Sequence, residues 1–187
     1  MRFILNKFPE DKNFEPNDEW TPLKEPKSFW DLNWQAVPFM VINVLLMLLL
    51  LKTIGISFKL NTVTTLVSFC IFVPFHELLH ALFYPENIMS KNIYFGFYAK
   101  ALVPFVSYTG EIKRNTYIRV YLAPLVIITI LGLLFLLFWG SNQLVEHIVV
   151  LNALGSCADC LSVFLILRQI PKNAILRSKK WKTYYKC

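Results

Sequence analysis

The segment FVPFHELLHALFY, residues 72–84, places one carboxylate and two imidazoles inside an otherwise apolar run. These residues are His76, Glu77 and His80, in the order H-E-x-x-H. On a helix, side chains four residues apart lie on one face, so both histidines can bind one zinc ion. Zinc lowers the pKa of a bound water towards about 7, and Glu77 can then accept its proton as general base. The pattern predicts a zinc metalloendopeptidase of the HExxH type.

Five-residue patterns of this kind also occur by chance, so the motif alone is weak evidence. Its apolar surroundings make the functional interpretation much stronger. Across residues 62–84 the only charged or histidine side chains are these three. A charged side chain at the centre of a membrane helix costs roughly 2.5–3.5 kcal/mol on insertion scales, so such residues are usually functional. In the alternative interpretation, the histidines only pair with polar groups on neighbouring helices and Glu77 is protonated.

Asp159 is the residue we expect to complete the metal site. A hydrolytic zinc site usually takes three protein ligands and leaves one position for water. Asp159, in the stretch NALGSCADC, is the only carboxylate deep inside another apolar run. At about 1.5 Å per residue, both histidines and Asp159 fall in the same half of their runs. We therefore predict His76, His80 and Asp159 as ligands; the alternative for Asp159 is a hydrogen bond between packed helices.

Other polar residues near this position leave alternatives open. Cys157 and Cys160 compete as soft ligands, but a buried carboxylate needs a compensating charge and a thiol does not. His147 lies too close to the outer end of the fourth predicted helix to reach the metal. Asn152, two helical turns before Asp159, either contributes to substrate binding or only bonds to neighbouring helices. The four cysteines do not form an obvious disulfide set, and buried inert thiols are the default.

The composition places these residues in a membrane protein. The chain of 187 residues is 56% hydrophobic and 17% charged, whereas about a quarter of a soluble domain is charged. A helix needs roughly 20 apolar residues to cross the bilayer core. Four runs approach this length: residues 36–51, extendable to about residue 58, and residues 62–84, 120–139 and 148–167. We predict an all-α membrane protein with about four transmembrane helices.

The basic residues predict the orientation. All 19 Lys and Arg residues except Lys52 and Lys59 fall at the termini or between the second and third runs. Because cytoplasmic loops carry the excess of Lys and Arg, we expect a multi-pass protein of the cell membrane with both termini in the cytoplasm. This bias and contact with anionic lipid explain the net charge of +7, so we expect no nucleic-acid partner. The sequence does not give the oligomeric state.

The sequence also predicts the division of the chain into segments, the structure of one loop and an irregularity in the third helix. We expect residues 1–35 to be a polar cytoplasmic segment without a signal peptide, residues 36–170 a transmembrane metalloprotease-like domain, and residues 171–187 a basic cytoplasmic tail. Between the second and third helices, NIYFGFYAKALVPFVSY is rich in aromatic and branched residues, which favours a short hairpin on the cytoplasmic face. In the third helix, we expect Pro124 to kink the helix or free a carbonyl.

A membrane-embedded H-E-x-x-H followed by a carboxylate on a later helix resembles the site-2-protease type of intramembrane metalloprotease. Those enzymes carry an Asn- and Pro-rich stretch that ends in Asp-Gly, whereas here Cys160 follows Asp159 and the prolines are absent. The chain more closely resembles the putative zincin peptidases, a bacterial family of small four-helix membrane proteins with an Asn…Asp element in the last helix. This resemblance covers about residues 36–175 and implies His76, His80 and Asp159 as zinc ligands and Glu77 as the base.

Three classes of function fit these features to different degrees. We expect an intramembrane-type zinc protease that contacts membrane lipid and hydrolyses membrane-inserted or membrane-proximal peptide or protein substrates. The alternative is a non-proteolytic membrane metal-binding protein that acts as an immunity or regulatory partner-binding factor. A transporter or channel is disfavoured, because only two of the four apolar runs carry the polar cluster and no polar stripe follows the others.

Overall fold

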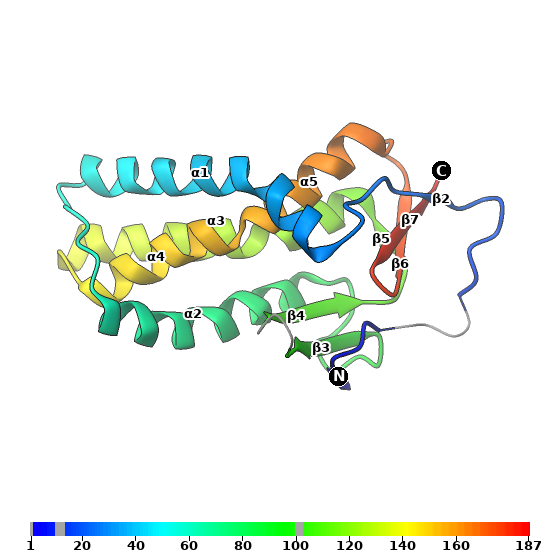
Figure 1. Cartoon of the computed structure of the whole chain (residues 1–187), viewed down its shortest axis with the longest axis horizontal. Helices are drawn as coiled ribbons and strands as arrows, with labels where there is room; N and C mark the ends of the chain where they lie inside the picture. The colour runs from blue at the N-terminus through cyan, green and yellow to red at the C-terminus, as the bar shows by residue number, and fades with distance from the viewer. Residues whose placement is uncertain (1, 10–13, 100–102) are drawn as a thin grey trace. The chain divides into compact units, whose positions relative to one another are not determined.

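A computed structural model describes residues 2–9, 14–99 and 103–187 of the chain (Figure 1). These residues form two compact units. The helical unit comprises Lys27–His76 and Leu122–Leu161, and the strand unit comprises Met1–Pro26, Glu77–Tyr121 and Ser162–Cys187. Helices α2, α3 and α5 pass from one unit into the other, so each is continuous across a boundary.

The helical unit is built from α1 (Phe29–Thr53), α4 (Gln143–Gly155) and parts of α2 (Thr62–Phe83), α3 (Arg114–Trp139) and α5 (Cys157–Gln169). The side chain of Ser28 accepts the backbone N–H of Asp31 at 3.1 Å and caps α1. This cap starts the first helix before residue 36, so the start that the apolar run predicted is too late. The apolar core of the unit contains Met47, Leu51, Ile56, Leu136, Val149 and Ala153.

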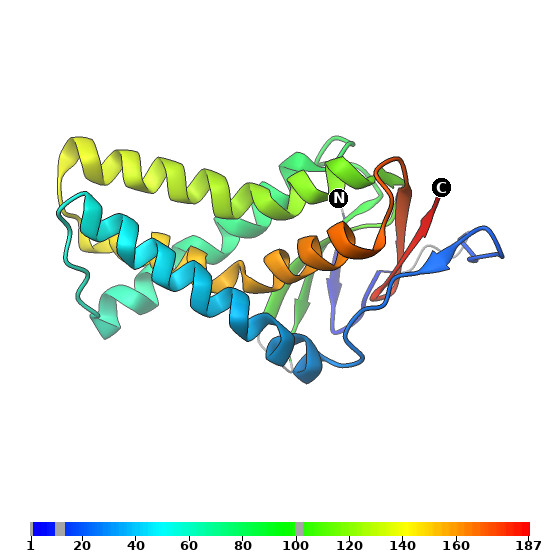
Figure 2. The ribbon, with the colours of Figure 1, turned by 90° about the horizontal axis from the view of Figure 1, so that it is seen from above.

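In the described part of the chain, four helical stretches are long and apolar enough to cross a membrane: Phe29–Thr53, Thr62–Phe83, Arg114–Trp139 and Gln143–Gln169. Their number confirms the prediction from composition. α3 ends at Trp139 and α4 begins at Gln143, so the turn between them is short (Figure 2). At Gly132 in α3, an added Cβ would lie 2.2 Å from Cγ1 of Val149, so this glycine lets α3 and α4 pack closely.

The fourth stretch is two helices rather than the single helix that we predicted. α4 ends at Gly155 and α5 begins at Cys157, with Ser156 between them. The Ser156 N–H donates to the Asn152 carbonyl at 3.0 Å, and the Ser156 carbonyl accepts the Cys160 N–H at 3.0 Å. These are the last hydrogen bond of α4 and the first of α5, so Ser156 ends one helix and precedes the next, and Asp159 comes to lie in the first turn of α5. A carboxylate is favoured there, because a helix N-terminus carries partial positive charge.

The strand unit contains a sheet of three strands in the order β1-β3-β4: β1 (Arg2–Leu5), β3 (Ile93–Tyr98) and β4 (Val103–Tyr108). β3 and β4 pair antiparallel, from Ile93 opposite Tyr108 to Tyr98 opposite Val103. This pairing confirms the hairpin predicted between the second and third helices, although part of its turn lies outside the described residues. β1 pairs parallel to β3 and comes from the segment that we predicted to be a polar leader.

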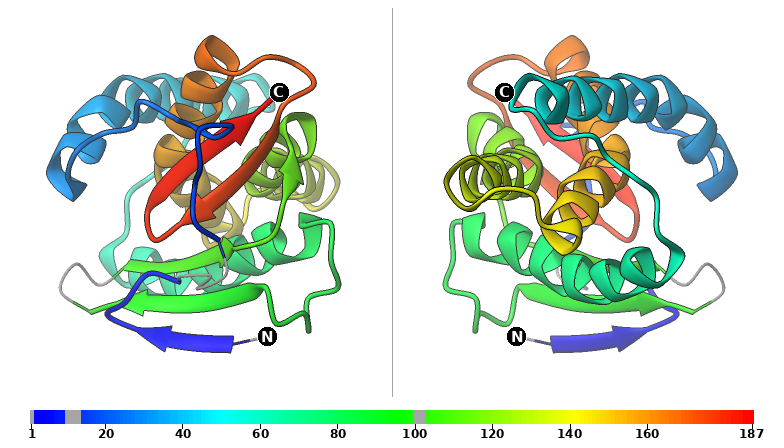
Figure 3. Two further views of the ribbon diagram at one scale, coloured as in Figure 1. Left: turned by 90° about the vertical axis from the view of Figure 1, so that its right-hand side faces the viewer. Right: turned by 90° about the vertical axis from the view of Figure 1, so that its left-hand side faces the viewer.

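A second sheet has the order β2-β7-β6-β5: β2 (Thr21–Pro22), β5 (Ile112–Lys113), β6 (Ile175–Lys179) and β7 (Lys182–Lys186). Figure 3 shows β6 and β7 side by side in orange and red. Leu176 and Thr183 are buried, whereas most of the lysines of this hairpin are more exposed. The described residues are therefore mostly helical with two small sheets, and the all-α prediction is wrong for these strands, because segments far apart in sequence pair here.

Candidate metal centre

The motif histidines lie one turn apart on α2, as the four-residue spacing predicted. His76 is 6% exposed and His80 is 5% exposed, so both rings are buried among apolar helices. Glu77 follows His76 directly on α2 and is half-buried. The helix continues through this segment, so the spacing of these three residues is a property of α2 itself.

In the helical unit, His76 contacts a polar side chain at each ring nitrogen. Its Nε2 lies 3.2 Å from Oδ2 of Asp159, and its Nδ1 lies 3.2 Å from Oδ1 of Asn152. Phe72 packs edge-on against the ring, with the centroids 5.2 Å apart. The carboxylate that sequence depth singled out therefore meets the first histidine of the motif.

Asn152 is fully buried and its amide has one consistent orientation. Its Nδ2 donates to the carbonyls of Pro124 at 3.2 Å and of Leu125 at 3.4 Å, which leaves Oδ1 facing His76. An amide oxygen only accepts, so Nδ1 of His76 donates to Asn152, and Nε2 is the ring nitrogen that faces the Asp159 carboxylate. Bonding to neighbouring helices was one of our two expectations for Asn152; a role in substrate binding stays a prediction.

In the strand unit, His80 is held by a backbone carbonyl that the sequence analysis missed. Its Nδ1 lies 2.9 Å from the carbonyl oxygen of Val120 on α3. Its ring also lies beside Tyr121, which stacks on Tyr117 with the centroids 4.4 Å apart. A carbonyl only accepts, so Nδ1 of His80 donates to Val120, and Nε2 is the ring nitrogen left for a metal ion. The sequence signal for this contact is Pro124, four residues after Val120 in the same helix.

One ligand atom from each of His76, His80 and Asp159 lies within 4.8 Å of the other two. Two neutral imidazoles and one carboxylate are a donor set that zinc takes in hydrolytic sites, so these residues fit the ion. The hydrogen bonds at the two Nδ1 atoms are outer contacts of the kind that orient metal-bound histidines.

The competing ligands lie outside this group in the described part of the chain. Neither Cys157 nor Cys160 belongs to it. The Sγ of Cys160 instead lies 3.4 Å from Nδ2 of Asn43 on α1. His147 accepts the Asn61 N–H on Nε2 at 3.1 Å and donates from Nδ1 to the Gln143 carbonyl at 2.6 Å, so both of its nitrogens are occupied.

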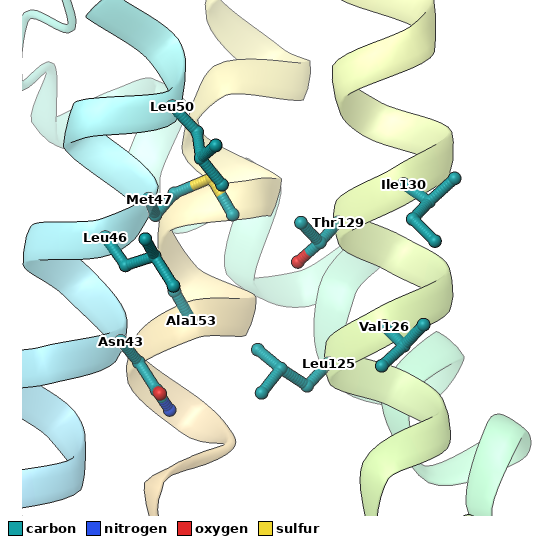
Figure 4. A pocket seen from close by; sticks show the side chains of 9 residues that line it. All are labelled: Asn43, Leu46, Met47, Leu50, Leu125, Val126, Thr129, Ile130 and Ala153. Carbon is teal, nitrogen blue, oxygen red and sulfur yellow. The ribbon is translucent and has the colours of Figure 1, made fainter.

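The helical unit also contains an apolar pocket of about 230 Å³ (Figure 4). Its walls come from α1, α3 and α4: Asn43, Leu46, Met47, Leu50, Leu125, Val126, Thr129, Ile130 and Ala153. The Thr129 hydroxyl is buried without a hydrogen-bond partner among the described residues. Ala153 lines this pocket and follows Asn152 directly on α4. The pocket therefore adjoins the part of α4 whose Asn152 side chain contacts His76.

Comparison with protein families identifies the chain over most of its helical part. Residues 69–175 match the family described as putative zincin peptidase, and this range is more than half of the chain. It includes the H-E-x-x-H motif, Val120, Pro124, Asn152 and Asp159. Comparison with curated proteins and with solved structures finds no match. The family indicates a zinc metallopeptidase, and the chain belongs to the putative zincin peptidase family.

Proposed function

We propose that the protein is a zinc-dependent metalloprotease of the cell membrane, which cleaves peptide bonds in membrane-inserted or membrane-proximal substrates. The observation that carries this proposal is the convergence of His76, His80 and Asp159 on helices apolar enough to span a membrane. Family membership supports the peptidase activity. We propose the intramembrane setting because the three ligands lie within these apolar helices.

The roles of the residues follow from their chemistry. His76, His80 and Asp159 would hold the metal ion, which when bound supplies Lewis-acid catalysis and activates water. Glu77 is not among the three ligands and can accept a proton from water and pass it to the leaving amine. Asn152 and the Val120 carbonyl keep the imidazole rings oriented.

The substrate must be extended at the scissile bond, because an intact helix hides its carbonyls in hydrogen bonds. We propose that β4 binds the extended segment as an added strand. β4 is the last strand in its sheet among the described residues. The Thr109 N–H donates to the Asn92 carbonyl at 3.1 Å, towards β3. Since N–H groups alternate in direction along a strand, those of Val106 and Tyr108 point away from β3.

The apolar pocket supports a hydrophobic substrate. Its lining consists of aliphatic side chains apart from Asn43 and Thr129. Such a pocket accepts an apolar side chain of a membrane segment and offers little to a charged one.

The test is the zinc content of the purified protein, measured by elemental analysis beside the variants His80→Ala, Asp159→Ala and Glu77→Gln. We expect about one zinc ion per chain in the parent and in Glu77→Gln, and loss of zinc in the other two variants. Glu77→Gln should abolish cleavage of a membrane-inserted substrate while it keeps zinc. A parent without zinc would overturn the metal centre.

Cleavage that persists in Glu77→Gln would show that this residue is not the general base. Binding of a protein partner that survives this substitution, without any cleavage by the parent, would instead support the non-proteolytic alternative.

A further inference from the structure

Pro124 lies in the interior of α3, where a proline removes one backbone hydrogen bond. In a regular helix, the N–H of residue 124 would donate to the carbonyl of residue 120. Proline has no N–H, so the Val120 carbonyl lacks its usual donor. α3 nevertheless continues from Arg114 to Trp139. The helix therefore accommodates the proline, and Val120 is the residue whose carbonyl loses its helical donor.

The freed carbonyl is the one that accepts His80. Nδ1 of His80 lies 2.9 Å from the Val120 oxygen, and Val120 is fully buried. A buried backbone carbonyl without a donor costs free energy, and in an apolar setting water does not replace the donor. The contact therefore satisfies both partners: the imidazole N–H finds an acceptor, and the carbonyl regains a donor.

We propose that Pro124 is a positioning residue of the metal centre. By withholding an N–H from Val120, it keeps that carbonyl available as the acceptor for His80 Nδ1–H, and so holds the His80 Nε2 lone pair ready for the metal ion. This inference rests on the metal centre of the proposed function and not on peptide hydrolysis. Removal of a hydrogen-bond acceptor that orients a metal-binding histidine usually weakens metal affinity by about 10- to 100-fold.

The neighbouring carbonyls of α3 serve the other motif histidine. The Pro124 and Leu125 carbonyls accept Nδ2 of Asn152, and Oδ1 of Asn152 accepts His76 Nδ1–H. The segment from Val120 to Leu125 thus orients both histidines through their Nδ1–H groups, His80 directly and His76 through Asn152. A second proline offers a matched control: Pro38 lies inside α1 and is exposed.

The experiment compares Pro124→Ala, Pro38→Ala and Pro124→lactate, the α-hydroxy acid analogue of alanine, which also lacks the N–H. Zinc affinity of the full chain in lipid nanodiscs is measured by competition with a chelator. The His80 tautomer is read from ¹⁵N-histidine NMR spectra of the metal-free protein, which has only three histidines. His80→Gln identifies the His80 signals.

We expect Pro124→Ala to weaken zinc binding about tenfold and to give a mixture of His80 tautomers, because its new N–H competes for the Val120 carbonyl. Pro124→lactate should restore both properties, and Pro38→Ala should match the parent. Unchanged zinc affinity in Pro124→Ala overturns the proposal, and so does a loss that the lactate variant fails to rescue, since proline geometry would then be the cause. A parent that binds zinc but cleaves no substrate would overturn proteolysis and leave the role of Pro124 standing.

Discussion

At the residue scale, the two motif histidines both donate from Nδ1 but have different partners. His76 is oriented by a side-chain amide, and His80 by a backbone carbonyl. A mutation can remove the amide directly, whereas the carbonyl is reached only through residues such as Pro124. The two contacts are therefore separable by experiment.

We predict that Asn152→Ala weakens zinc binding by about 10- to 100-fold, because His76 loses the acceptor for its Nδ1–H. The variant should also be less stable by about 1–3 kcal/mol, since buried polar groups lose their partner. Chelator competition and thermal unfolding measure the two effects. The control is Asn43→Ala, which removes another amide of the helical unit that contacts Cys160. Equal zinc affinity in Asn152→Ala and the parent would contradict the positioning role.

At the element scale, hydrogen bonds to Glu86 connect the loop after α2 with the end of β4. Its carboxylate accepts hydrogen bonds from the Ser90 hydroxyl, from Tyr108 at 2.6 Å and from Asn92 at 2.9 Å. These bonds hold the pKa of Glu86 below its ordinary value of 4.5. Burial, and then the bond to Glu86, raises the pKa of Tyr108, so this phenol stays a donor.

The depressed pKa of Glu86 predicts a pH-dependent contribution to stability. The contribution is fully present above 4.5, the ordinary pKa, and is lost as the pH falls towards the lower folded-state pKa. We expect the parent to be more stable than Glu86→Gln at pH 7 and the difference to shrink below about pH 4.5. Thermal unfolding of both proteins from pH 7 to pH 3 measures this. A difference that stays constant over this range would show that the charge of Glu86 is not responsible.

The edge of β4 opposite β3, which pairs with no other described strand, predicts a second effect at this scale. Val106→Pro removes an N–H that points away from β3, so the β3–β4 ladder loses no donor. If substrate adds to this edge, kcat/KM for a membrane-inserted substrate should fall about fivefold, which corresponds to one hydrogen bond of roughly 1 kcal/mol.

Two controls belong with Val106→Pro. Zinc content should equal that of the parent, and Val106→Ala, which keeps the N–H, should retain the parental kcat/KM. Full activity in Val106→Pro would exclude strand addition at this position.

At the scale of the whole molecule, the orientation in the membrane remains a prediction from the basic residues. Cys187 is exposed at the C-terminus, so a membrane-impermeant maleimide should label it only after the cells are permeabilised. Lys59→Cys, between the first two apolar helices, should be labelled in intact cells. Labelling of Cys187 in intact cells would reverse the predicted topology.

The sequence alone determined the features that depend on local spacing and composition. Four apolar stretches, the one-turn pair His76 and His80, and the choice of Asp159 all follow from counting residues, because hydrophobic length and helical period are properties of short segments. The β3–β4 hairpin was also predictable, since its composition is local.

Only the tertiary structure decided the contacts that join distant segments. β1 pairs with β3 from the N-terminal segment, β7 pairs with β2, and the Val120 carbonyl accepts His80 from another helix. The break at Ser156 was likewise not predictable from the apolar run, because the residues of α4 and α5 form one continuous apolar stretch. Pairing and packing partners depend on which surfaces meet in the folded chain, and no local pattern of residue types encodes that choice.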